Sequence, residues 1–247
     1  MSTTPRFFVP PEAIVGSEAV LPPEVLHHAR TVLRLRPGEI LILHDGRGFA
    51  HEAIFGEGKS STVVVRRSYP LKTEPVLRIT VAQALTRTGE KMEQVLQHGT
   101  EIGAAGFIVF PAERSVARPE SAEKWEKRKE RWAAIVKSAS EQSRRAVLPT
   151  VEWEPRLAAV AERLGRFDLA VVLHESAEAA FRTVFPPPET PIGTLLLLVG
   201  PEGGWTENEV EVLARVGGRP VNLGPRILRT ETAALAALAQ ALYAREP

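Results

Sequence analysis

Two different hydrophobic patterns divide the chain. In residues 1–72, short apolar runs alternate with glycine-containing turns, which predicts a small β-barrel. Its strands are expected at 40–43, 50–55 and 62–65, with one inserted helix at 22–33. In residues 73–247, apolar runs alternate with stretches of helical spacing, a pattern that predicts a parallel sheet covered by helices.

The carboxyl-terminal pattern assigns most of its residues to alternating strands and helices. Strands are expected at 77–84, 107–111, 169–173, 195–199 and 221–223. Helices are expected at 91–102, 122–145, 157–164, 177–184, 206–216 and 231–245. Two prolines interrupt the periodicity at 69–75, so the domain boundary is placed there, between residues 72 and 73.

Composition then limits the class of protein. The chain has 247 residues, is 44% hydrophobic and contains no cysteine, which excludes disulfides, thiolate metal sites and a cysteine nucleophile. No apolar run approaches the ~20 residues that a membrane helix needs, and the amino terminus does not resemble a signal peptide. We therefore expect a cytoplasmic protein with no membrane association and no metal.

Charge is unevenly distributed, although the formal net charge is only +1. It amounts to +2 in residues 1–72, +4 in residues 78–145 and −4 in residues 146–247. This asymmetry favours nucleic-acid contacts toward the amino-terminal half of the chain.

Two glycine-containing loops follow predicted strands near the carboxyl end. One follows an apolar run that ends at Val199, and the other follows Leu223. Because glycine has no side chain, the backbone of such a loop can approach a ligand closely. Thr206 and Glu209 have the spacing of a capping box, so a helix is expected to begin just after the first loop. The loop residues are Gly200, Pro201, Glu202, Gly203 and Gly204 in the first, and Gly224, Ile227, Leu228, Arg229 and Thr230 in the second.

Each of these residues also has a purely structural interpretation. The glycines could form tight turns only, and Glu202 could complement a helix dipole. Thr230 could be a helix N-cap with Glu231 as a first-turn acid. Leu173, His174 and Glu175 end another predicted strand, where ligands of α/β sheets collect, although a His-Glu pair is often a simple loop cap. Neither GxxxxGK[ST] nor GxGxxG occurs, which argues against a phosphate-binding enzyme.

The segments GPEGGWTENE and LGPRILRTETA together resemble the paired signature of the bacterial 16S rRNA uridine N3-methyltransferases, a family in the SPOUT class of S-adenosylmethionine (AdoMet) enzymes. Residues 6–9 and 27–38 resemble the amino-terminal RNA-binding domain of that family. The resemblance implies a PUA-like β-barrel at 1–72 and a SPOUT methyltransferase domain with a carboxyl-terminal trefoil knot at 73–247. It also implies a homodimer, joined through the alanine-rich terminal helix that contains Leu238.

The resemblance further implies an AdoMet pocket and an RNA surface. The pocket is expected to contain Leu173, His174, Glu175 and Val199, the five residues of the first loop, and Leu223, Gly224, Ile227, Leu228, Arg229 and Thr230. Arg229 is the candidate for stabilising an anionic base, and Glu231 or Glu202 is the candidate proton acceptor. The expected RNA contacts are Arg6, His27, Arg30, Arg34 and Arg36, with Arg30 and Arg34 on one helix face.

The function implied is methylation of N3 of a uridine in 16S rRNA of the 30S ribosomal subunit, by resemblance uridine 1498. N3 of uracil normally pairs, so the enzyme must meet an unpaired or flipped base. Two alternatives stay open. One is a SPOUT enzyme that methylates a ribose 2′-hydroxyl, and the other is a non-catalytic rRNA-binding assembly factor.

Overall fold

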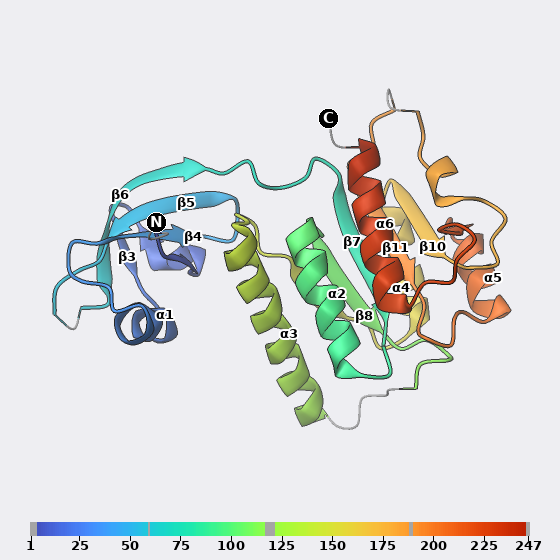
Figure 1. Ribbon diagram of the computed structural model, residues 1–247, viewed down its shortest axis with the longest axis horizontal. Helices are drawn as coiled ribbons and strands as arrows, with labels where there is room; N and C mark the ends of the chain where they lie inside the picture. The colour runs from blue at the N-terminus through green and yellow to red at the C-terminus, as the bar shows by residue number, and fades with distance from the viewer. Residues whose placement is uncertain (1–3, 59, 117–121, 188–189, 246–247) are drawn as a thin grey trace. The chain divides into compact units, whose positions relative to one another are not determined.

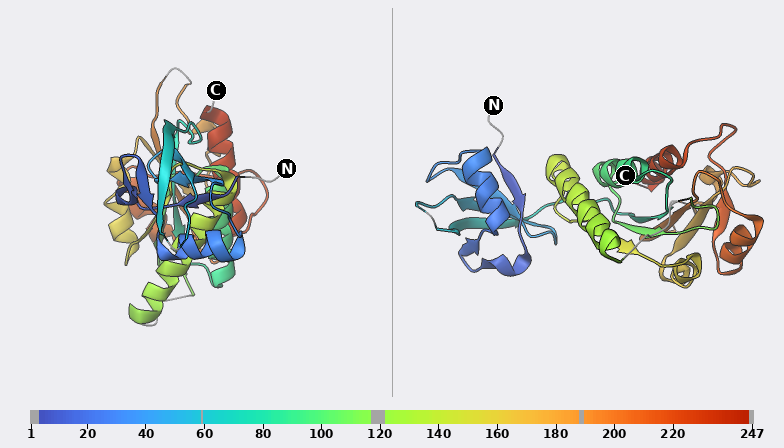
Figure 2. Two further views of the ribbon diagram at one scale, coloured as in Figure 1. Left: turned by 90° about the vertical axis from the view of Figure 1, so that its left-hand side faces the viewer. Right: turned by 90° about the horizontal axis from the view of Figure 1, so that it is seen from below.

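The computed structural model describes residues 4–58, 60–116, 122–187 and 190–245 (Figures 1 and 2). The chain forms two compact units. The first comprises Met1–Glu74 and Ser140–Leu148, and the second comprises Pro75–Ala139 and Pro149–Pro247. Among the described residues, no helix is long and apolar enough to cross a membrane.

The first unit is built on a six-stranded sheet in the order β1-β4-β5-β6-β3-β2. β1 pairs with β4 in parallel, and the other pairs are antiparallel. No pattern in the sequence predicts β1, β2 or β3, each of which has three residues or fewer. The strands are β1 (Arg6–Phe8), β2 (Ile14–Val15), β3 (Glu18–Val20), β4 (Ile40–His44), β5 (Phe49–Ile54) and β6 (Thr62–Pro70), with a 3-10 turn at Pro11–Ala13.

The helix expected at 22–33 is present in two pieces. α1 (Pro23–His27) continues into a π-helical turn, η2 (His28–Val32), and Val25 and Ala29 anchor them in the core of the unit. The helix ends before Arg34, whose φ is 53°. The prediction that Arg30 and Arg34 share one helix face is therefore wrong, because the left-handed backbone at Arg34 turns the chain away from the helix.

The segment Ser140–Leu148 packs as part of the first unit, although it lies far from the rest of that unit in the sequence. The carboxylate of Glu74 forms an ion pair with the guanidinium of Arg145 and accepts a backbone N–H from Val147 at 3.2 Å. His44 Nδ1 lies 3.0 Å from the carbonyl oxygen of Arg145. Burial raises the pKa of Glu74, but the hydrogen bonds and charge of Arg145, with the backbone N–H, lower it overall below its ordinary value.

The second unit contains a parallel sheet in the order β12-β10-β11-β7-β8-β9. This confirms the predicted class of α/β fold. The apolar runs occupy the middle of the sheet because both of its faces are covered. The strands are β7 (Arg78–Ala84), β8 (Gly106–Phe110), β9 (Thr150–Trp153), β10 (Leu169–Leu173), β11 (Thr194–Val199) and β12 (Arg219–Val221).

Helices cover the two faces of this sheet (Figures 1 and 2). On one face, residues of α2 (Gly89–Ile102), α3 (Ala122–Ser143) and α6 (Thr230–Arg245) join a core with alternate strand residues such as Leu197 and Val199. On the other face, α4 (Leu157–Ala161) and α5 (Glu207–Arg215) pack with Leu196 and Leu198. Strand alternation thus divides the core into two layers.

Three expectations for the second unit need correction. The helix expected at 177–184 is absent apart from a 3-10 turn, η4 (Phe181–Thr183). The backbone of this segment bonds to Asn222 instead: Ala179 O accepts the N–H of Asn222, and the N–H of Phe181 donates to Asn222 O, both at 2.9 Å. α4 ends at Ala161 and is followed by a 3-10 turn, η3 (Leu164–Arg166). The last strand lies at Arg219–Val221 rather than 221–223, and the edge strand β9 was not predicted.

Candidate functional site

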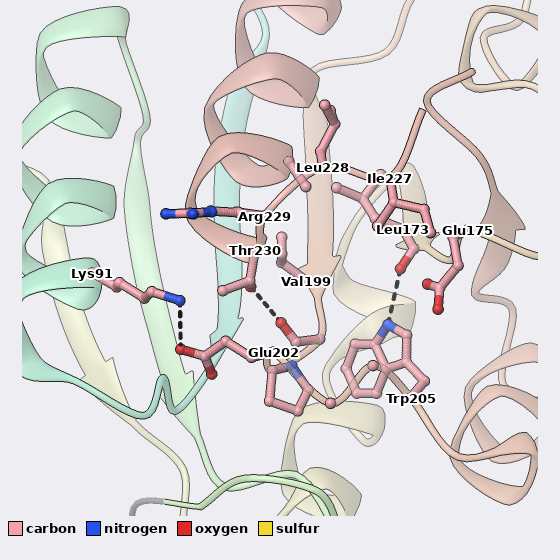
Figure 3. A pocket seen from close by; sticks show the side chains of 15 residues that line it. Lys91, Leu173, Glu175, Val199, Glu202, Trp205, Ile227, Leu228, Arg229 and Thr230 are labelled. Atoms are coloured by element: carbon pink, nitrogen blue, oxygen red, sulfur yellow. Dashed lines mark hydrogen bonds and ion pairs between the residues drawn. The ribbon is translucent and has the colours of Figure 1, made fainter. Parts of the chain in front are cut away.

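A pocket of about 430 Å³ opens at the carboxyl ends of β10 and β11 in the second unit (Figure 3). Its lining comes from four separate segments of the chain: the loop after β11, the loop before α6 with the start of that helix, the end of β10, and Lys91 of α2. This is the edge at which ligands of open α/β sheets bind. The lining residues are Lys91, Leu173, Glu175, Val199, Gly200, Pro201, Glu202, Gly203, Gly204, Trp205, Ile227, Leu228, Arg229, Thr230 and Ala233.

A second cavity, of about 80 Å³, shares Leu173, Glu175, Ile227 and Leu228 with the first. It is also lined by His174, Leu223 and Gly224. The two cavities together collect every residue that the sequence assigned to cofactor binding. The fold thus brings three loops that are distant in sequence to one place, as the parallel sheet requires.

A buried hydrogen-bond network holds the two glycine loops together. The Thr230 hydroxyl donates to the carbonyl oxygen of Gly200 at 2.5 Å, and Gln83 Nε2 donates to Thr230 Oγ1 at 2.9 Å. Gln83 is fully buried at the end of β7. Thr230 is therefore not an N-cap. It is the first residue of α6, and its hydroxyl binds the neighbouring loop. Gln83 was not predicted as a site residue, because it lies inside an apolar strand and belongs to no motif.

The glycines of the first loop are needed for contacts within the protein. A Cβ atom at Gly200 would lie 3.1 Å from the indole nitrogen of Trp205, and one at Gly203 would lie 3.0 Å from Cβ of Arg114. Gly204 has a φ of +68°, which favours glycine. The loop is compact because its neighbours pack directly against its backbone, so a side chain at Gly203 would disturb Arg114 as well as any ligand.

The apolar end of the pocket is fixed by Trp205. Its indole N–H donates to the carbonyl oxygen of Leu173 at 3.0 Å, which joins the first loop to the end of β10. The ring also stacks with Phe110, with 6.2 Å between ring centroids. The next residue, Thr206, forms the predicted capping box with Glu209. These contacts hold the loop in one conformation ahead of α5.

The opposite end of the pocket is charged. Lys91 of α2 places its ammonium nitrogen 3.0 Å from Oε1 of Glu202 (Figure 3). The same nitrogen lies 3.7 Å from Oε2 of Glu231. Glu202 also accepts the backbone N–H of Arg87 at 3.1 Å. Burial raises the pKa of Glu202, but its hydrogen bonds to backbone N–H groups and Lys91 lower it overall. Glu202 is therefore an ionised partner of Lys91.

Glu231 and Arg229 differ from Glu202 in their contacts. Glu231 is 8% exposed, and its Oε2 atom has no hydrogen-bond partner in the part of the chain that the structure describes. Arg229 is exposed at the rim of the pocket, where its side chain points toward the Lys91 end (Figure 3). The pocket thus combines an apolar end with a charged end, which Lys91, Arg229 and Glu202 line and where Glu231 lies beside Lys91.

The residues expected to bind RNA lie in the first unit and differ in availability. Arg30 donates to the carbonyl oxygens of Gly58 and Ser60 at 2.7 and 2.8 Å, so its guanidinium already supports a loop. Arg34, Arg36 and His27 are exposed, and Arg6 donates to Thr4 O at 3.3 Å.

Among the described residues, no group of three or more His, Cys, Asp or Glu side chains could hold a metal ion.

Fold and site together define an α/β protein with a pocket between loops at the carboxyl edge of a parallel sheet. Comparison with known protein families identifies the family to which the chain belongs. Residues 72–242 match the family model of the RNA methyltransferase domain, and residues 21–65 match that of the RNA methyltransferase PUA domain. The chain belongs to the RNA methyltransferase family, and its amino-terminal unit contains a PUA domain.

Individual relatives match along nearly the whole chain. Ribosomal RNA small subunit methyltransferase E of Bacillus subtilis is 37% identical over 232 residues, which is 90% of this chain and 89% of the relative. The protein of the same name from Mycobacterium bovis is 38% identical over 240 residues, covering 94% of this chain and 88% of the relative.

Solved structures match equally well. Ribosomal RNA small subunit methyltransferase E of Neisseria gonorrhoeae, bound to S-adenosyl methionine, has a TM-score of 0.86 and 32% identity, with 98% of each chain covered. A methyltransferase of Legionella pneumophila in complex with the same cofactor has a TM-score of 0.85, 33% identity and the same coverage. The resemblance inferred from the two glycine loops is thereby confirmed.

Proposed function

We propose that this protein transfers the methyl group of AdoMet to N3 of a uridine in 16S rRNA of the small ribosomal subunit. The observation that carries the proposal is the pocket formed by the three loops that contain the family signature. The names of the relatives support rRNA of the small subunit as the substrate. The resemblance adds the choice of N3 and of uridine 1498.

The pocket suits AdoMet in size and in chemistry. Its volume of about 430 Å³ lies within the range of roughly 300–1,000 Å³ typical of small-molecule sites. Leu173, Val199 and Leu228 supply apolar contacts for an adenine ring, and main-chain groups of the two loops can bind its edge. When bound, AdoMet supplies an electrophilic methyl group.

The charged end suits the acceptor base. Loss of the N3 proton leaves a uracil anion whose charge is spread over O2 and O4. Arg229 is placed to stabilise that charge, because no hydrogen bond or ion pair of its side chain is found among the described residues. Of the two carboxylates, Glu231 is the better proton acceptor, since its Oε2 atom accepts no hydrogen bond from the described residues while Glu202 is already hydrogen-bonded.

We also propose that the two units divide the work of binding, the first holding rRNA and the second holding AdoMet. The exposed arginines Arg34 and Arg36 and the match to a PUA domain support this division. Activity on rRNA implies action in the cytoplasm.

Two architectural features complete the proposal. One is a homodimer formed through the outer face of α6. A groove of about 720 Å³ there is lined by Phe181, Phe185, Ala239, Gln240 and Tyr243, among others, and Tyr243 is 90% exposed. The other is a trefoil knot, supported by the return of the chain from β12, at one edge of the sheet, to pack α6 against α2, β11 and β7.

The experiment combines labelled AdoMet with two substrates, free 16S rRNA and small ribosomal subunits lacking the modification. Nucleoside digestion and mass analysis of the product should give N3-methyluridine. A methylated ribose would establish the 2′-hydroxyl alternative, and absence of transfer to both substrates would favour the non-catalytic assembly factor.

A further inference from the structure

Lys91 lies in the pocket although neither glycine loop contains it. It belongs to the first turns of α2, and its ammonium group is held between Glu202 of the first loop and Glu231 of α6. Its side chain is 26% exposed, so the cation reaches the pocket while it remains largely surrounded by protein. Three segments of the fold thus converge on one ammonium group.

The two carboxylates beside Lys91 differ in the number of hydrogen bonds that they accept. Glu202 receives a hydrogen bond from Lys91 and two contacts from the backbone N–H of Arg87. The Oε2 atom of Glu231 is buried and receives no hydrogen bond from any described residue, and Lys91 lies 3.7 Å away. An ammonium group has three donors, and Glu202 accepts only one of those of Lys91, which leaves donor capacity for a ligand.

The donors and acceptors at the charged end of the pocket are complementary to the pairing edge of uracil. The pairing edge of uracil presents a carbonyl oxygen, an N3–H donor and a second carbonyl oxygen. Lys91 and Arg229 supply cationic donors, and Glu231 supplies an acceptor, so the set is complementary to that edge. Cytosine presents an acceptor at N3 and a donor at N4, and it would place an acceptor against the Glu231 carboxylate.

Resting on the proposed function, we propose that Lys91 is a catalytic residue whose ammonium donates to a carbonyl oxygen of the target uracil and stabilises the base when N3 loses its proton to Glu231. The N3–H bond breaks and the proton goes to the Glu231 carboxylate. The electron pair left on N3 forms the bond to the methyl carbon, and the pair of the breaking C–S bond stays on sulfur. Glu202 orients Lys91.

The test measures single-turnover methyl transfer at saturating AdoMet for Lys91→Met, Lys91→Arg and the control Lys127→Met. Lys127 is an exposed lysine of α3, paired with Glu123. Loss of a preorganised donor should lower the rate about 100-fold for Lys91→Met. Lys91→Arg keeps a cation and should lose less, and Lys127→Met should match wild type. AdoMet affinity by calorimetry should stay unchanged in all three.

A second substrate separates charge stabilisation from a merely structural role. Small subunits assembled with 16S rRNA that contains 5-fluorouridine carry a more acidic N3–H, so their base anion needs less stabilisation. The loss in Lys91→Met should shrink on this substrate. An equal loss on both substrates, or a parallel loss of AdoMet affinity, would overturn the assignment of Lys91.

The same measurements keep the two proposals distinguishable. If wild-type protein forms N3-methyluridine and Lys91→Met does so at the same rate, the role of Lys91 is wrong and the proposed function stands. If the wild-type product is a methylated ribose, the proposed function fails, and the assignment of Lys91 fails with it. Circular dichroism of Lys91→Met and Lys91→Arg confirms that the variants are folded.

Discussion

Glu202 and Glu231 carry the same side chain and lie beside the same lysine, yet their surroundings give them different chemistry. Glu202 is fixed by donors that lower its pKa, so it is a weak base. Glu231 has a buried oxygen that accepts no hydrogen bond from the described residues, and the Lys91 ammonium lies 3.7 Å from it. At the scale of single residues, function therefore depends on which donors the fold places around a group, and residue type alone does not reveal it.

Thr230 provides the first prediction at this scale. Thr230→Val removes the hydroxyl that binds Gly200 O and receives Gln83 Nε2 while it keeps the shape of the side chain. We expect the free energy of unfolding to fall by about 1–3 kcal/mol, because buried polar atoms lose their partner. AdoMet affinity should fall about tenfold, or ~1.4 kcal/mol, because the two loops are no longer joined.

Urea unfolding and calorimetry measure both effects. Thr232→Val is the matched control, since Thr232 lies two residues further along α6 and is exposed. Unchanged stability and unchanged AdoMet affinity in Thr230→Val would show that this network does not hold the site.

Glu74 provides a pH-dependent prediction. Its pKa is below its ordinary value in the folded protein, so its ionised form stabilises the fold above pH 4.5. That stabilisation is lost as the pH falls through the lower folded-state pKa. Glu74→Gln should therefore lower the free energy of unfolding at neutral pH by about 2 kcal/mol, and the difference from wild type should vanish in acid.

Urea unfolding across this pH range checks the prediction, with the exposed residue Glu57 changed to Gln as the control. A difference between wild type and Glu74→Gln that does not depend on pH would contradict the role given to the ion pair with Arg145.

At the scale of elements, α6 shows how an alanine-rich helix can mislead. The family resemblance implies that this helix joins two subunits, and Leu238 was expected to lie in the contact surface. Leu238 is instead 0% exposed and packs in the core of its own unit, near Gly99 of α2. A charge at Leu238 would therefore unfold the unit rather than separate a dimer.

Tyr243 is the residue that tests the dimer. It is 90% exposed on α6 and lines the groove beside η4. Tyr243→Asp should convert a dimer to a monomer without loss of the thermal unfolding transition, because the change lies outside the core. Sedimentation measures the conversion, and Val216→Asp, at an exposed position after α5, is the control. A wild-type protein that is monomeric while fully active would contradict the dimer.

At the scale of the whole molecule, the division of binding between the two units makes a prediction about salt. Arg30 supports a loop of its own unit, so the exposed pair Arg34 and Arg36 is the better choice for phosphate contacts. Each phosphate contact contributes roughly −0.7 to −0.9 to the slope of log affinity against log salt. The double variant Arg34→Ala, Arg36→Ala should flatten that slope by about 1.5 and leave AdoMet affinity unchanged.

Filter binding to 16S rRNA at several salt concentrations measures the slope. Arg215→Ala, which removes an exposed arginine of α5, is the control. A wild-type slope in the double variant would place the RNA surface elsewhere.

The sequence by itself determined the α/β class, the parallel arrangement of the main strands and the loops of the site. Apolar runs that end at glycines are local signals, and the parallel sheet then brings its carboxyl-terminal loops to one edge. The capping box at Thr206 was also predictable, because both of its partners lie within one turn.

Only the tertiary structure decided the features that depend on distant partners. Residues 177–184 form no α-helix because their backbone bonds to Asn222, and Leu238 is buried because α2 lies against it. Lys91 and Gln83 enter the site from segments without a motif, and the donors that distinguish Glu202 from Glu231, Lys91 and the backbone N–H of Arg87, lie more than a hundred positions earlier in the chain. Such contacts join residues roughly 40–150 positions apart, and no local pattern encodes which of them meet.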